Sequence, residues 1–91
     1  MPHITVSLEK VVKSWCRLDN YYGFISKQLR KDGLDNATQT RLYIEAERID
    51  VVRHELMQAC GFEDYDTFVD FIEKQNFATW DKDYEKWLVN I

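Results

Sequence analysis

The sequence has few of the residues that build tight turns, disulfide frameworks or zinc sites. Three glycines and one proline, Pro2, are too few for a sheet protein with many tight turns. The two cysteines, Cys16 and Cys60, lack the close spacing of a disulfide framework or a zinc knuckle. We therefore interpret both as small buried hydrophobic residues in a reducing compartment, and we expect helices rather than strands.

The sequence also lacks the segments that direct a chain to a membrane. No window approaches the roughly 18 apolar residues of a membrane span, and no basic leader precedes an apolar run near the N-terminus. We expect a cytoplasmic protein that does not bind membranes. A chain of 91 residues with 45% hydrophobic content predicts a single domain, residues 1–91, and its thirteen aromatic residues can supply large contact areas to one core.

The stretch HELMQAC resembles the opening of a zinc-protease helix but does not complete it. Such a helix needs a second histidine four residues after His54, and Gln58 stands there, while His3 is the only other histidine. A catalytic pair of Cys16 and His54 would need an oriented base, yet His54 projects about 120° away from the apolar stripe of its helix. No glycine-rich phosphate loop occurs. We therefore predict no catalytic residue, no metal, no cofactor and no enzymatic activity.

Apolar residues recur at steps of three and four, which predicts an all-α fold. The expected architecture is a small domain of four helices. A long antiparallel hairpin of residues 8–31 and 37–60 is followed by two short helices over 65–75 and 80–89.

Capping residues mark the ends of these predicted helices. Gly61 is expected to take a left-handed conformation after the second helix, with Phe62 folding back on Met57. The expected N-caps of the four helices are Ser7, Asn36, Asp64 and Thr79.

The second predicted helix is apolar on two sides. Ile44 and Val51 lie almost opposite the stripe formed by Leu42, Ile49 and Leu56. Such a helix is sandwiched between neighbours or placed at an interface. This ridge predicts, as one alternative, a homo-dimer or a homo-oligomeric structural or adaptor module.

Arg53 falls within about 20° of the centre of the apolar stripe of the same helix. The favoured interpretation lays its aliphatic stem along the core and lets the guanidinium reach water. The alternative is a buried ion pair with Asp19 or Glu45 that fixes the register of the hairpin.

Charge is distributed unevenly along the chain, and this is the main functional clue. The formal net charge is -4, yet residues 1–36 carry a net +2 and residues 61–91 a net -5. We predict a non-enzymatic regulator or inhibitor, of the size common among accessory proteins of phages and mobile elements. It would dock an acidic, aromatic surface on a basic or nucleic-acid-binding groove of a protein partner, as a nucleic-acid mimic. The candidate residues are Asp66, Asp70, Phe71, Glu73, Trp80, Asp81, Asp83, Glu85 and Trp87.

The main alternative is a nucleic-acid-binding subunit that uses the first helix. Basic residues fall within about 100° of arc opposite its apolar stripe, where they could follow phosphates while an aromatic ring stacks on bases. The residues of this face are Lys10, Lys13, Arg17, Phe24, Lys27 and Lys31.

Overall fold

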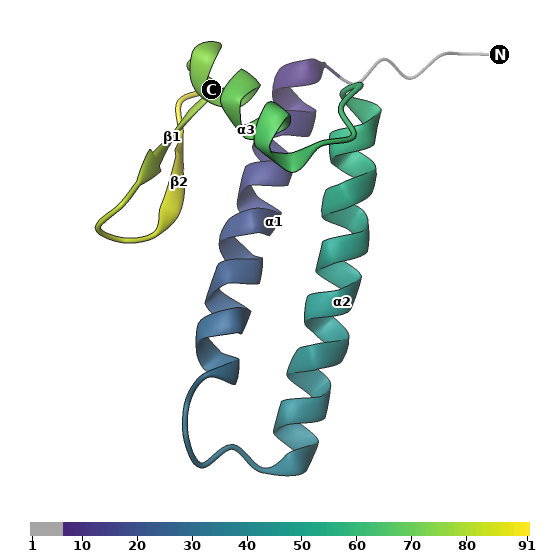
Figure 1. Cartoon of the computed structure of the whole chain (residues 1–91), viewed down its shortest axis with the longest axis vertical. Helices are drawn as coiled ribbons and strands as arrows, with labels where there is room; N and C mark the ends of the chain where they lie inside the picture. The colour runs from purple at the N-terminus through teal and green to yellow at the C-terminus, as the bar shows by residue number, and fades with distance from the viewer. Residues whose placement is uncertain (1–6) are drawn as a thin grey trace, which may run out of the picture.

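The computed structural model describes residues 7–91 as three helices followed by a β-hairpin (Figure 1). The helices are α1 (Leu8–Leu29), α2 (Asn36–Ala59) and α3 (Tyr65–Lys74). The strands β1 (Ala78–Asp81) and β2 (Lys86–Val89) pair antiparallel, with Trp80 opposite Trp87. The predicted all-α fold of four helices is therefore wrong.

The error lies at residues 80–89, where a helix was predicted and a hairpin is present. The apolar spacing fits a helix, but a short apolar run does not separate helix from strand, and threonine, tryptophan and valine favour strands. The side chain of Asp81 accepts hydrogen bonds from the backbone N–H groups of Asp83 (2.9 Å) and Tyr84 (3.3 Å), which stabilises a turn. Glu85 follows in the left-handed region, with φ of 53°. This local turn chemistry ends β1 and starts β2.

The caps of the three helices follow the sequence closely. Ser7 and Asp64 are the N-caps of α1 and α3, as predicted, and their side chains accept from the N–H groups of Lys10 and Thr67. The cap of α2 is Asp35 rather than Asn36, and its carboxylate accepts from Thr38 at 2.7 Å. Because Thr79 lies inside β1, it caps no helix.

The predicted turn after α2 is confirmed. Gly61 has φ of 89°, and its N–H donates to the carbonyl of Gln58 at 2.9 Å. The N–H of Phe62 donates to the carbonyl of Met57 at 3.2 Å, which completes a Schellman motif. The chain therefore reverses sharply into α3.

Helices α1 and α2 lie side by side and antiparallel, while α3 and the β-hairpin gather near one end of this pair (Figure 1). At that end, α3 and the hairpin cover one face of α1, and the largest core cluster lies between them. It contains Val12, Trp15, Cys16, Met57, Phe68, Ile72, Ala78 and Trp87.

Toward the connection between α1 and α2, the two helices pack mainly on each other, and the hairpin loop reaches α1 through the ion pair of Lys27 and Glu85. A second, smaller cluster there joins Ile25, Ala46 and Ile49. The face of α2 that does not pack on α1 is covered by no other element within residues 7–91. In the described part of the chain, no helix combines the length and apolar character needed to cross a membrane.

Candidate functional site

A buried carboxylate joins α1, α2 and β2. Asp19 on α1 is only 9% exposed. One carboxylate oxygen accepts from Nη1 of Arg53 on α2 at 2.5 Å, and the other accepts from Nε1 of Trp87 on β2 at 2.8 Å. The second guanidinium nitrogen, Nη2, donates to Asp50 at 2.6 Å. This network satisfies every charged group it buries, which is the condition under which a buried ion pair is tolerated.

Arg53 is therefore half-buried and pairs with Asp19, as the alternative interpretation of an ion pair expected, while its second nitrogen contacts the exposed Asp50. Its guanidinium also lies over the ring of Tyr22, 4.1 Å from the ring centroid. Burial alone would lower the pKa of Arg53, but the hydrogen bonds to Asp50 and Asp19 and their negative charges outweigh burial and raise it. Of the two partners expected for it, Asp19 is used and Glu45 is not, because Glu45 accepts from the hydroxyl of Tyr21 at 2.8 Å.

The β-hairpin is held on α1 by a second set of polar contacts. The side-chain amide of Asn20 donates to the backbone carbonyl of Trp87 at 3.0 Å and accepts from its N–H at 2.6 Å. A third strand paired with β2 would make the same two hydrogen bonds, one to the carbonyl and one from the N–H of Trp87. At Trp87 the outer edge of β2 is thus satisfied by α1 and is not available to another chain.

The aromatic residues predicted for the partner surface are used mostly inside the protein. Trp87 is 3% exposed and belongs to the main core. Phe71 is half-buried and packs against Phe62 and Phe77. Trp80 remains 38% exposed, with its ring edge-on to Trp87 at 5.3 Å between centroids. Of these three predicted anchor rings only Trp80 is exposed, while Tyr84 in the hairpin loop, which was not among them, is 71% exposed.

The predicted acidic residues fall into two groups. Asp66, Asp70 and Glu73 share one exposed face of α3, where Asp70 pairs with Lys74 at 2.9 Å. Asp81, Asp83 and Glu85 lie at or beside the loop of the β-hairpin, which points away from α3 in Figure 1. The carboxylate of Asp81 is occupied in the turn, and that of Glu85 pairs with Lys27 on α1 at 3.2 Å.

That last ion pair also affects the proposed basic face of α1. Lys10, Arg17, Phe24 and Lys31 are exposed, and Lys13 is half-buried. Lys27 contacts Glu85, so the acidic hairpin loop offsets positive charge on this face. A nucleic-acid backbone approaching α1 would meet this carboxylate as well as the lysines.

Burial makes the thiols poor nucleophiles. It raises the pKa of Cys16 to about 12, with a further contribution from the negative charge of Asp19. Burial also raises the pKa of Cys60 above its usual value. His54 is exposed on α2. Among residues 7–91, no group of three or more histidine, cysteine, aspartate or glutamate side chains is arranged to hold a metal ion.

We expect Cys16 to react with a thiol-specific reagent far more slowly than Cys60 in the folded protein at pH 8, because the thiolate is the reactive form. Folding raises the pKa of Cys16 from 9.0 to about 12, so the folded state binds the thiol proton more tightly than the unfolded state. The resulting contribution to the free energy of unfolding is fully present below pH 9 and is lost as the pH rises toward 12. Mass spectrometry of labelled peptides measures both rates. Equal labelling rates for Cys16 and Cys60 in the native protein would contradict the burial of Cys16. As a control, the two rates should become equal in concentrated urea, where the protein is unfolded.

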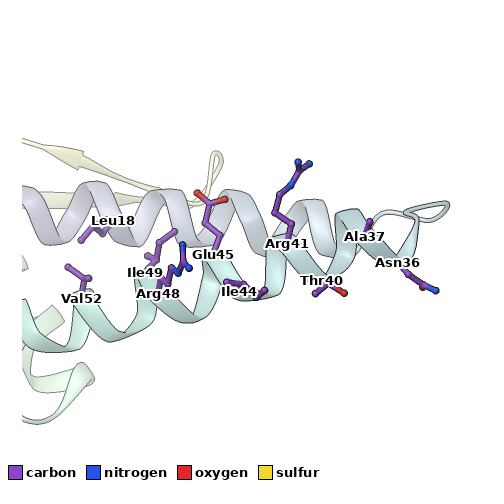
Figure 2. A pocket seen from close by; sticks show the side chains of 10 residues that line it. All are labelled: Leu18, Asn36, Ala37, Thr40, Arg41, Ile44, Glu45, Arg48, Ile49 and Val52. Carbon is purple, nitrogen blue, oxygen red and sulfur yellow. The ribbon is translucent and has the colours of Figure 1, made fainter.

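A groove lies on the open side of the α1/α2 pair, away from α3 and the β-hairpin (Figure 2). Its volume is about 950 Å³. Figure 2 shows Leu18 of α1 and Val52 of α2 pointing into the space between the helices, with Ile44 and Arg48 further along α2. The residues that line it are Leu18, Asn36, Ala37, Thr40, Arg41, Ile44, Glu45, Arg48, Ile49 and Val52.

An exposed apolar ridge runs beside this groove along α2. Ile44, Val51 and Val52 are 46%, 57% and 43% exposed, and a second hollow on this face is lined by the same three residues with Glu47 and Arg48.

We define the open face of α2 as six residues that share one side of the helix, are all exposed, and belong to neither core cluster. They are Ile44, Arg48, Val51, Val52, Glu55 and Ala59. The sequence already revealed the ridge of Ile44 and Val51. The other four residues were missed, although their spacing from Ile44 and from each other is helical.

Comparison with known proteins adds no family. No family model matches the sequence, and no similar curated protein or solved structure was found. The function must therefore be argued from the geometry of the chain itself.

Proposed function

We propose that this protein is a non-enzymatic binding module that works by docking the open face of α2 on another protein chain. The observation that supports the proposal is the uncovered apolar ridge of Ile44, Val51 and Val52. Burying these side chains would stabilise a complex by roughly 25 cal/mol for each Å² of apolar surface removed from water. The core formed by residues 7–91 does not use them, since all three lie outside both of its clusters.

The surroundings of the ridge suit a protein partner. Arg41, Arg48 and Glu55 flank the apolar residues with charges of both signs, as at the polar rim of a protein interface. A regulator or inhibitor of this kind needs no catalytic group. The acidic surface of α3 and the hairpin loop would steer a partner with a basic surface over distance rather than anchor it, and it would not steer a second copy, which carries the same charges.

Site-specific photo-cross-linking tests this proposal. A photoreactive phenylalanine analogue replaces Val51 in one variant and Phe24 in a matched control, because Phe24 is 55% exposed on α1, outside the open face of α2. We expect the probe at position 51 to capture a protein chain in cells of the source organism, either another protein or a second copy, and the probe at 24 to capture none.

Absence of any cross-linked protein at position 51, or equal capture at both positions, would contradict the proposal. Circular dichroism of each variant confirms that the helices are intact. The mass of the captured product separates self-association from binding to a different protein.

A further inference from the structure

The open face of α2 has a charge pattern that matches itself when reversed. Arg48 and Glu55 are seven residues apart, so they lie on the same side of the helix, separated by about 10 Å at a rise of 1.5 Å per residue. Val51 and Val52 lie midway between them. Both charged side chains are exposed, and within residues 7–91 neither takes part in an ion pair.

An antiparallel copy of α2, related by a two-fold axis between Val51 and Val52, would place complementary residues opposite each other. Arg48 of each chain would face Glu55 of the other chain. Ile44 would face the second copy's Ala59 at each end. A two-fold interface requires this self-complementarity, because the same patch is used by both chains.

Other arrangements of the same face are less favourable. A parallel pair would place Arg48 opposite Arg48 and Glu55 opposite Glu55. Moving the two-fold axis to Arg48 in the antiparallel pair would place the two copies of Arg48 against each other at the centre of the interface, with Glu55 facing Arg41 further out. Like charges at an interface oppose association, whereas opposite charges fix its register.

We infer that the open face of α2 is a two-fold dimer interface with a second copy of this chain, its antiparallel α2 helices crossing at Val51 and Val52. This inference rests on the proposed docking role of that face and names its occupant. Neither α3 nor the β-hairpin lies over this face, so neither element obstructs a second copy. The four helices of two chains would then form a bundle that covers the apolar ridge of each.

Charge reversal tests the arrangement directly. In a homodimer of the Arg48→Glu variant, positions 48 and 55 are acidic on both chains, so like charges face each other. In a homodimer of the Glu55→Arg variant, the same two positions are basic on both chains. In an equimolar mixture, the two variants can pair with each other. Position 48 of the first variant, now acidic, then faces position 55 of the second, now basic, and the unchanged Glu55 and Arg48 face each other as well. Only pairing between chains can restore the match, because the two positions lie about 10 Å apart within one helix.

We expect sedimentation equilibrium to give a two-chain mass for the wild type. The dimer dissociation constant of each single variant should be at least about tenfold higher than that of the wild type. The dissociation constant of the mixture should lie within about threefold of the wild-type value. Glu73→Lys, a charge reversal on the exposed face of α3 and outside the open face of α2, serves as the matched control and should change the dissociation constant less than about threefold.

A one-chain mass for the wild type at all concentrations, or a mixture that associates no better than the separate variants, would overturn the inference. Both positions are solvent-exposed on α2, so each variant should keep its helices. Circular dichroism of each variant tests this and so separates weaker association from loss of folding. If the wild type is monomeric while position 51 still captures a different protein, the docking role stands and the second-copy assignment fails.

Discussion

Replacing Asp19 with alanine should reduce the free energy of unfolding by about 3–5 kcal/mol, the cost of breaking a buried ion pair on one side. The carboxylate accepts from Arg53 on α2 and from the indole N–H of Trp87 on β2. Without it, the guanidinium keeps one partner, the exposed Asp50, and the indole N–H has none. Urea denaturation monitored by circular dichroism measures the change.

Asp50→Ala is the matched control for this prediction. It removes a carboxylate from the same guanidinium, but the Asp50 side chain is 61% exposed. Its loss should cost less than about 1 kcal/mol, as is typical of exposed ion pairs. If Asp19→Ala and Asp50→Ala destabilised the protein equally, Asp19 would not be the joint between the three elements.

Trp87→Ala should cost about 3–5 kcal/mol, in the range measured for large aromatic residues removed from cores. Its ring is 3% exposed, lies against Trp15 at 6.1 Å between centroids, and donates to Asp19. Trp87→Phe keeps an aromatic ring but removes the donor, so we expect a smaller loss of about 1–3 kcal/mol. Thermal and urea denaturation provide the measurements.

The facing residue of the hairpin, Trp80, is the natural comparison. Trp80 is 38% exposed, and its replacement by alanine should cost about 1 kcal/mol through loss of its contact with Trp87. Both rings project from the same face of the hairpin, and only Trp87 is buried, so a larger loss for Trp80 than for Trp87 would contradict the assignment of Trp87 as the residue that docks this face.

Local signals predicted the helices better than the hairpin. Ser7, Asp64 and Gly61 act through hydrogen bonds to residues within five positions, so the sequence alone reveals them. At residues 78–89 the helical spacing of the apolar residues conflicts with the turn chemistry of Asp81. The outcome there depends on docking against α1, since Asn20 satisfies the backbone of Trp87 from 67 positions away. Periodicity within a short segment carries no information about such a contact.

The candidate site shows the same division. The ridge of Ile44 and Val51 was predictable, because a helix that is apolar on two sides has more apolar surface than one neighbour can cover. The burial of Trp87 was not, because the prediction placed it in the partner-binding surface of a helix and its partner Asp19 is distant in sequence. Arg53 was placed correctly at the core-facing side, but its pairing depended on where Asp19 and Asp50 lay in space.

Hydroxyl-radical footprinting of the unmodified protein tests the central claim most directly, which is that the open face of α2 is a docking surface. The oxidation of Ile44, Val51 and Val52 is compared between purified protein, diluted until it sediments as one chain, and protein in an extract of source cells, with exposed Phe24 and Tyr84 as internal controls. The account predicts that oxidation of the three α2 residues falls in the extract while that of the two controls does not. Equal oxidation of the α2 residues under both conditions would contradict it.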